Sequence, residues 1–213
     1  MTQNECGHLV TGGMLMPVIF SEEKRKELEK DIKAAALRMF EEKGIRNTTV
    51  SEIAQSVGIA KGTFYNFFES KGALICSIID DYDQKAYDRI YERLGSEKKM
   101  PAADFYKIYS SIFTPENTFF CHIDANDIEW MKNDPQTKML FNSERAKKLA
   151  AKLLGFMEGV RADPDLGYIA NTIKTINLIL ENRDLFCAEV LNKNISFLPE
   201  HLLLYVTGKE DIH

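Results

Sequence analysis

The sequence lacks the features that mark membrane and secreted proteins. No apolar run approaches the roughly 18 residues that a membrane-spanning helix requires. Residues 1–20 contain no Lys or Arg, so they lack the charged start of a signal peptide. We expect them to form a flexible N-terminal arm, or to reflect a start codon assigned too early, with Met14 or Met16 as alternatives. The chain is therefore predicted to be cytoplasmic, with no membrane partner.

Cysteines are few, and motifs of catalysis are missing. The four cysteines lie 45 or more residues apart, without a C-x-x-C pair, which favours reduced thiols over a disulfide framework or a zinc ribbon. Cys121-His122-x-Asp124 has no second pair of ligands nearby, so we predict no metal site and no cofactor. No phosphate loop, nucleophile motif, H-E-x-x-H or carboxylate pair at catalytic spacing is present. We predict that the protein is not an enzyme.

Basic residues are too few for a uniformly basic surface. Lys and Arg total 27 against 32 Asp and Glu, which gives a net charge of -5 and excludes a nucleic-acid coat protein. The charge is uneven, because residues 21–74 carry +1 and residues 75–213 carry -5. A local basic face in the first part remains compatible with a nucleic-acid partner.

Helical periodicity is abundant, whereas alternating β-branched runs are short. Apolar residues recur at i, i+4, i+7 and i+8 from Glu22 to Lys43, with Ser21 as N-cap and Gly44 as the stop. These patterns predict an all-α chain. Further helices are predicted at roughly 70–94, 101–113, 124–133, 136–160, 164–182 and 185–206.

Between the first and fourth helices, the sequence predicts a helix-turn-helix. Thr49 and Glu52 form a capping box, Gly58 supplies a left-handed corner, and a second short helix begins near Ala60. Ser70 then caps the fourth helix. We assign Phe64 and Phe68 of the second short helix to the core.

Exposed positions on the second short helix are small or hydrogen-bonding residues around its N-terminal turn. That part of a recognition helix meets base edges in DNA. The candidates for this role are Lys61, Gly62, Thr63, Tyr65 and Asn66. Thr48 and Thr49, at a helix N-terminus, can bind a phosphate, and Lys71 offers a charge to the same DNA backbone.

This segment closely resembles the DNA-binding domain of TetR/AcrR-type transcriptional regulators. The resemblance covers about residues 22–80 and departs from the usual pattern at Ala60, Phe67 and Gly72-Ala73, where a capping Ser, a His or Tyr and an acidic pair are common. The matching motifs are Thr48-Thr49-Val50, Glu52-Ile53-Ala54, Gly58, Lys61-Gly62-Thr63, Tyr65, Phe68 and Ser70-Lys71.

The resemblance implies a three-helix helix-turn-helix DNA-binding domain at residues 21–74. It implies a larger helical domain at residues 75–213 that binds an effector and dimerises. Lys61, Gly62 and Thr63 would face bases or nearby phosphates, while the Tyr65 hydroxyl donates to a phosphate. Thr49 and Lys71 would anchor the DNA backbone.

The expected function is transcriptional repression by a homodimer bound to a palindromic operator in double-stranded DNA. A small hydrophobic or amphipathic effector would release the repressor. The alternative is a helix-turn-helix protein controlled by a protein partner, with no small-molecule effector. The first 80 residues do not distinguish these two forms of control.

Two sets of apolar residues in the second part support this plan. Helical stripes predict a four-helix dimer interface, with an intramolecular core as the alternative. The interface set is Leu166, Ile169, Ile173, Ile176, Leu180, Leu198 and Leu202. Aromatic residues with a few polar groups predict a ligand pocket, with plain core as the alternative. The pocket set is Tyr106, Tyr109, Phe113, Phe120, His122, Asn126, Trp130 and Phe156.

Overall fold

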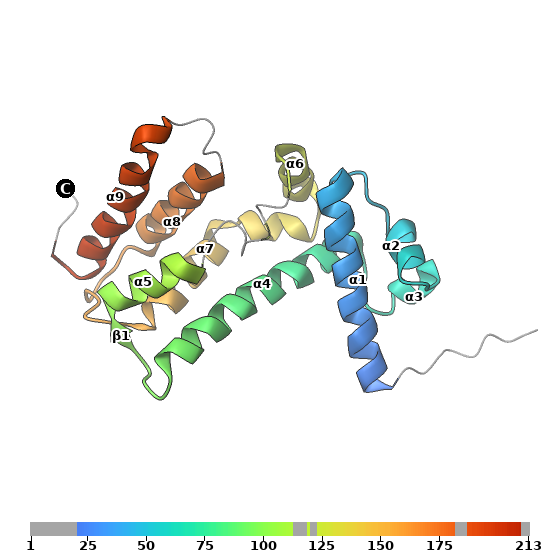
Figure 1. The fold of residues 1–213 in the computed structure, drawn as a ribbon, viewed down its shortest axis with the longest axis horizontal. Helices are drawn as coiled ribbons and strands as arrows, with labels where there is room; N and C mark the ends of the chain where they lie inside the picture. Colours follow the sequence, from blue (N-terminus) through green and yellow to red (C-terminus); the bar gives the residue numbers. More distant parts are fainter. Residues whose placement is uncertain (1–20, 113–118, 120–122, 182–186, 210–213) are drawn as a thin grey trace, which may run out of the picture.

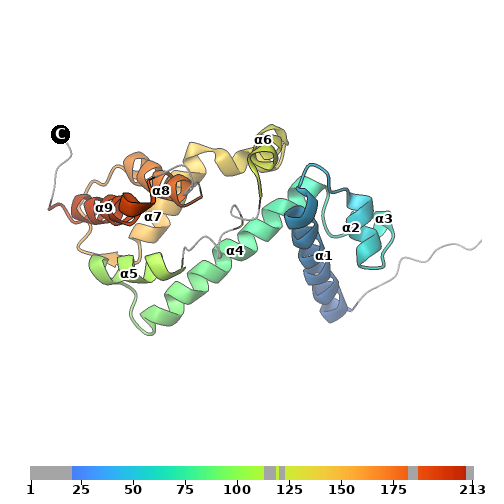
Figure 2. The same ribbon diagram turned by 45° about the horizontal axis from the view of Figure 1, so that its top comes forward.

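The computed structural model describes residues 21–112, 119, 123–181 and 187–209, and most of them are helical (Figure 1). Long helix α4 joins a group of three helices, α1 to α3, to a second group that contains α5, α7, α8 and α9 (Figure 2). None of the described helices is long and apolar enough to span a bilayer. The helices are α1 (Glu22–Lys43), α2 (Val50–Ser56), α3 (Lys61–Phe64), α4 (Lys71–Leu94), α5 (Ala102–Ile112), α6 (Ala125–Asn133), α7 (Ser143–Leu154), α8 (Leu166–Glu181) and α9 (Ala188–Val206), with a 3-10 helix η3 (Thr137–Phe141).

The all-α prediction is confirmed, with a small addition. Strands β1 (Met100–Pro101) and β2 (Met157–Glu158) pair in parallel, with Met100 opposite Met157. The backbone N–H of Met100 also donates to the carbonyl of Phe156 at 2.9 Å. The pair ties the loop after α4 to the loop after α7.

Local signals set the ends of the N-terminal helices as predicted. The Ser21 hydroxyl accepts from the Lys24 N–H at 3.3 Å at the start of α1. Gly44 ends the helix with φ 83°, and its N–H donates to the Phe40 carbonyl. The Ser70 hydroxyl accepts from the Ala73 N–H at 3.0 Å, so α4 begins with a side-chain cap.

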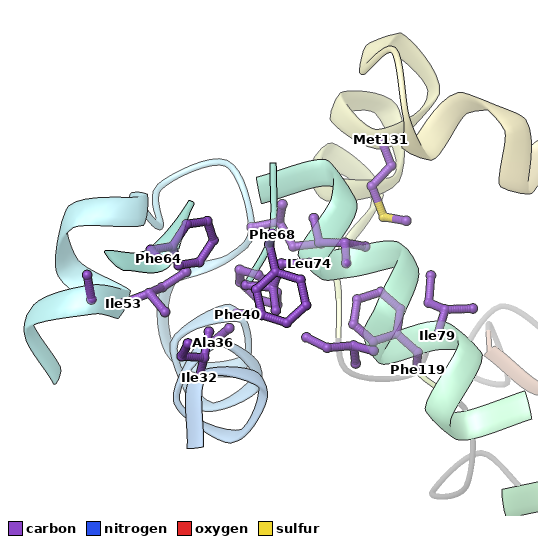
Figure 3. Close-up of a cluster of buried hydrophobic side chains, with 14 residues drawn as sticks. Ile32, Ala36, Phe40, Ile53, Phe64, Phe68, Leu74, Ile79, Phe119 and Met131 are labelled. Atoms are coloured by element: carbon purple, nitrogen blue, oxygen red, sulfur yellow. The ribbon is translucent and has the colours of Figure 1, made fainter. Parts of the chain in front are cut away.

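The core of the N-terminal helices extends beyond the predicted domain boundary at residue 74. Phe64 and Phe68 are buried in it, as the sequence predicts. Figure 3 shows side chains of α1, α2, α3 and α4 converging on one cluster, together with Phe119 and with Met131 from α6. The first half of α4 also belongs to this cluster. The cluster consists of Ile32, Ala36, Phe40, Ile45, Ile53, Ala54, Phe64, Phe68, Leu74, Ile75, Ile78, Ile79, Phe119 and Met131.

The second half of α4 packs elsewhere. Tyr87 and Ile90 lie in a separate cluster with Phe105 of α5 and Phe156. Helix α4 therefore contributes to two cores in succession. The division of the chain at residue 74 stays a prediction, and in the structure that boundary falls inside α4.

The prediction of one long helix in the middle of the second part is wrong. Residues 136–160 are not a single helix, because the chain breaks at Asn142 between η3 and α7. The Asn142 side chain accepts from the Glu144 N–H at 2.9 Å and caps α7, which ends at Leu154. The other predicted helices in the second part agree with α5, α6, α8 and α9 to within a few residues.

Candidate nucleic-acid interface

The helix-turn-helix is built by local caps and a glycine corner. Helix α2 starts at the capping box of Thr49 and Glu52, and Gly58 turns the chain with φ 72°. Ala60 precedes α3 in an extended conformation and makes no side-chain cap. Helix α3 continues as turns, since the Phe68 N–H donates to the Phe64 carbonyl at 3.0 Å.

Most of the predicted base-facing residues lie on the outer surface of this unit. Lys61, Gly62, Tyr65 and Asn66 are exposed, and Thr63 is half-buried. A Cβ built on Gly62 would meet no described atom within 4 Å, apart from its chain neighbours and its own helix. Another molecule can therefore approach the backbone closely at this position. The exposed residues together give α3 a polar N-terminal turn that faces solvent. A recognition helix needs such a turn to reach base edges.

Thr49 is exposed but its hydroxyl is occupied. It donates to Glu52 Oε2 at 2.7 Å, and the Thr49 N–H donates to the same oxygen at 2.9 Å. Lys43 Nζ donates to Glu52 Oε1 at 2.5 Å. Hydrogen bonds from Lys43 and Thr49 lower the pKa of Glu52 to about 2. A phosphate at this helix N-terminus would therefore meet a carboxylate, and Thr49 would need to exchange its partner to bind it.

Thr48 is wrongly predicted as a phosphate ligand. Thr48 is only 1% exposed, and its hydroxyl donates inward to the Gly44 carbonyl at 2.8 Å and the Met39 carbonyl at 3.3 Å. These bonds close the turn after α1. The sequence suggested an exposed pair of threonines because it does not show which of two neighbours turns inward.

Lys71 also differs from the prediction, because its ammonium group points into the protein. Its Nζ donates to the carbonyls of Ile45 at 2.6 Å and Thr48 at 2.8 Å, and lies 4.4 Å from the centre of the Trp130 ring. Burial lowers its pKa, while the charge of Asp127 raises it. In this conformation the side chain does not offer its charge to DNA.

Arg25 is a residue that sequence reasoning missed. It belongs to the first turns of α1, where its guanidinium donates to the Asn66 carbonyl at 3.4 Å and lies 5.6 Å from the Phe67 ring centre. A cation thus lies beside the end of the recognition segment. The basic run Lys24-Arg25-Lys26, directly after a capped helix start, was the available signal.

Of the predicted pocket residues, the four whose side chains the structure describes lie in two places, two on α6 and two in the cluster of α4 and α5. Trp130 packs against the N-terminal core, and Asn126 is exposed on α6 beside a polar cleft between α6 and the end of α1. Tyr109 and Phe156 pack in the cluster of α4 and α5. Burial raises the pKa of the Tyr109 hydroxyl. Phe113, Phe120, His122 and the side chain of Tyr106 lie outside the described residues.

The predicted dimer residues divide between two environments. Ile169 is 2% exposed in a core between α7, α8 and α9, and Leu166, Ile173 and Leu202 pack against that core. For these four the alternative, an intramolecular core, describes the packing in this chain. Ile176 and Leu198 are half-buried, and the side chain of Leu180 lies outside the described residues.

The described residues offer no obvious metal centre. No group of three or more His, Cys, Asp or Glu among them could hold a metal ion. Cys121 and His122 of the cluster noted in the sequence lie outside them. The arrangement of the site is instead that of a short helix with an exposed polar turn on a buried apolar base.

Comparisons with known proteins agree with this geometry. Residues 32–78 match the family described as bacterial regulatory proteins, tetR family. The HTH-type transcriptional regulator YuxN of Bacillus subtilis (strain 168) is 46% identical over 65 residues, which are 30% of this chain and 22% of that protein. The first curated relatives are thus matched over only a fifth to a third of their own length.

Longer matches extend through the second helical part. The HTH-type transcriptional regulator EthR of Mycolicibacterium smegmatis is 27% identical over 185 residues, covering 84% of this chain and 82% of that protein. A crystal structure of a TetR-family transcriptional regulator from Syntrophomonas wolfei has the same fold, with a TM-score of 0.59 and 20% identity. That match covers 89% of this chain and 100% of the other.

Proposed function

Since the chain belongs to the TetR family of bacterial transcriptional regulators, we propose that it is a repressor that an effector releases from a palindromic operator. The observation that carries this proposal is the exposed polar turn of α3. Lys61, Gly62, Tyr65 and Asn66 all face solvent there, while Phe64 on the same short helix is buried. The protein would act in the cytoplasm, on double-stranded DNA.

In the proposed complex, the N-terminal turn of α3 enters the major groove. Lys61 and Thr63 lie where base edges would be, Gly62 lets the backbone approach, and Tyr65 and Asn66 donate to phosphates. Arg25 adds a charge beside the same surface. Thr48 and Lys71 have no part in this contact, because their side chains donate inward to backbone carbonyls.

The repressor would work as a homodimer through α8 and α9. Leu178 and Phe197 on these helices are 54% and 63% exposed, so both could bury apolar surface in a subunit interface. Ile176 and Leu198 of the same helices are half-buried. A two-fold dimer would place the recognition helices about 34–36 Å apart, in successive major grooves.

For the effector, we propose the aromatic region of α4, α5 and α7 around Tyr109 and Phe156. A structure of SmeT, which shares this fold with a TM-score of 0.56 and 17% identity, has been solved as a complex with triclosan. An apolar or amphipathic effector would suit the aromatic side chains of this region.

A second candidate is control by a protein partner without a small molecule. The observation that favours it is that Tyr109 and Phe156 pack in one aromatic cluster with Tyr87 and Phe105. A library of apolar compounds separates the two candidates. Release of bound DNA by one of them supports effector control, and operator release only by added cell protein supports the partner.

The first test is binding of the purified protein to DNA from upstream of its own gene, with random duplex as competitor. Specific binding with two chains per site is the expected result. The variant Thr63→Ala should weaken binding to the specific site by about 1–3 kcal/mol and leave random duplex nearly unaffected. Equal loss on both DNAs would contradict the base-reading role of Thr63.

A further inference from the structure

A polar cleft of about 830 Å³ lies between the end of α1, the loop that follows it and the first turn of α6. Figures 1 and 2 both show α6 beside this end of α1. The volume is within the usual range of pockets that bind small molecules. The described residues of the aromatic cluster around Tyr109 and Phe156 do not line this cleft, so it is separate from the region proposed above for the effector.

Negative charge predominates in the lining of the cleft. Its charged residues are the acidic Glu41, Glu42, Asp124 and Asp127 and the basic Lys43 and Arg46. The charge of Lys43 is already balanced, because its Nζ lies 2.5 Å from Glu52 Oε1, and Glu52 does not line the cleft. Glu42 is exposed and forms no ion pair within the described part of the chain. A cleft with such an excess of one sign concentrates ligands of the opposite sign, here cations.

Asp127 is the buried carboxylate of this cleft. It lies in the first turn of α6, lines the cleft and is 2% exposed. Its Oδ1 accepts a hydrogen bond of 3.0 Å from the backbone N–H of Arg46, whereas its Oδ2 has no hydrogen-bond partner among the described residues. Lys71 interacts electrostatically with Asp127, but its ammonium group donates to the carbonyls of Ile45 and Thr48. A buried carboxylate with an unpaired oxygen is costly, so a ligand that brings a positive donor to it is bound favourably.

Glycine at position 44 leaves this carboxylate without a covering side chain. A Cβ on Gly44 would lie 3.2 Å from both carboxylate oxygens of Asp127, so any larger residue would crowd them. Gly44 itself lines the cleft. The wall beside Asp127 therefore consists of bare backbone, which leaves room for a ligand group near the carboxylate.

The placement of the carboxylates favours an extended organic cation over a metal ion. Glu42 belongs to the end of α1, whereas Asp127 belongs to α6, so the acidic residues come from two different elements that border the cleft. No group of three or more His, Cys, Asp or Glu among the described residues converges closely enough to hold a metal ion. A ligand with two separated ammonium groups can instead meet both elements. Each ammonium group carries three N–H donors, which suit carboxylate acceptors and the exposed amide oxygen of Asn126.

We propose that the cleft between α1 and α6 binds a small aliphatic amine with two or more ammonium groups. One ammonium group lies against Asp127, and another lies toward Glu42 at the end of α1. The amide of Asn126, which also lines the cleft, accepts a further hydrogen bond. This inference goes beyond the proposed function, because neither the contact with DNA nor the aromatic region around Tyr109 involves this cleft.

The test is calorimetric titration of the purified full chain with putrescine at low, constant ionic strength, without DNA. We expect wild type to bind one putrescine per chain. Asp127→Asn, which keeps an oxygen for the Arg46 amide, should weaken binding by about tenfold, because it removes a buried charged acceptor. Glu42→Gln should weaken it by about two- to fivefold, because that charge is exposed. The matched control is Glu129→Gln, which removes the same charge from an exposed position of α6 outside the cleft and should leave the affinity unchanged.

Two further titrations of wild type test the chemical class of the ligand. Butanediol, which carries hydroxyl groups in place of the ammonium groups, should not bind. Magnesium chloride should displace putrescine no more than sodium chloride does at the same ionic strength. Stronger displacement by magnesium would mean a metal site and would overturn the proposal.

The remaining outcomes decide between a built site and general attraction to an acidic protein. No binding of putrescine to wild type would overturn the proposal. Equal weakening in Asp127→Asn and Glu129→Gln would overturn it too, because net charge alone would then account for binding. If Asp127→Asn does not fold, the exposed Glu42→Gln decides against the same control. The proposed binding of DNA is tested separately, so either conclusion can fail without the other.

Discussion

Adding one methyl group at Gly72 tests how tightly α4 packs against the segment after α6. Gly72 lies in the first turn of α4 and is buried. A Cβ there would lie 2.9 Å from Gln136 Oε1 and nearer still to Asp134 Oδ1. Gln136 also contacts Ser70, and its Nε2 donates to Glu69 Oε1 at 2.5 Å. The methyl group would therefore enter a network of polar contacts rather than empty space.

The magnitude follows from two opposing effects. Replacing Gly by Ala in a helix gains at most about 1 kcal/mol, and less in the first turn. Overpacking a tight site costs about 1–3 kcal/mol. Asp134 has little freedom to rotate away, because its Oδ1 accepts from the N–H groups of Gln136 at 3.0 Å and Thr137 at 2.9 Å. We therefore expect Gly72→Ala to lower the free energy of unfolding by about 1–2 kcal/mol.

The assay is equilibrium unfolding in urea, with Gly62→Ala as the matched control. Gly62 is also helical, but no described atom outside its own helix and chain neighbours lies within 4 Å of its Cβ. We expect Gly62→Ala to leave stability unchanged or raise it by up to about 1 kcal/mol. A Gly72→Ala variant as stable as Gly62→Ala would refute the reasoning, since the two sites would then offer equal space.

Two further predictions concern charge and assembly. The pKa of Glu52 is lowered from 4.5 to about 2, so its contribution to stability is present above pH 4.5 and is lost as the pH falls toward 2. Urea midpoints of wild type and Glu52→Gln should therefore differ at pH 7 and converge between pH 4.5 and 2; a difference that stays constant with pH would contradict this. Phe197→Asp should convert dimer to monomer in analytical ultracentrifugation, whereas Met139→Asp, on an equally exposed side chain of η3, should not. A dimeric Phe197→Asp protein would place the interface elsewhere.

The elements that the sequence predicts well are those whose causes are local. The capping box of Thr49 and Glu52, the caps Ser21 and Ser70 and the corner at Gly58 each act within four residues. A pattern of neighbouring residues therefore suffices to place the helix-turn-helix. The buried positions of Phe64 and Phe68 follow from the same short-range geometry.

The break at Asn142 shows a local signal that periodicity obscured. Asn142 caps α7, and Asn followed by Ser143 and Glu144 is a typical helix start. The apolar and basic residues on both sides continue a helical spacing, which predicted one long helix. A capping residue inside a periodic run therefore indicates a helix boundary, even where the apolar spacing continues.

The direction of Lys71 could not be predicted from neighbouring residues. Its ammonium group turns inward because the carbonyls of Ile45 and Thr48 and the ring of Trp130 meet around it, and Trp130 is 59 residues away in the chain. The separation of the described pocket residues into two regions has a similar reason. Helical spacing identifies an apolar face but does not fix which neighbouring helix that face meets.

Helix α6 supplies part of the hydrophobic core of the N-terminal helices. Met131 of α6 is fully buried in the same cluster as Phe40 and Leu74, and burying one such side chain contributes about 1.5–3 kcal/mol. Ile78 and Ile79, beyond the predicted boundary, belong to that cluster too. Residues 21–74 alone would therefore expose much of the surface on which they fold. Helix α6 therefore contributes to the stability of the proposed DNA-binding helices, because one of its side chains lies in their core.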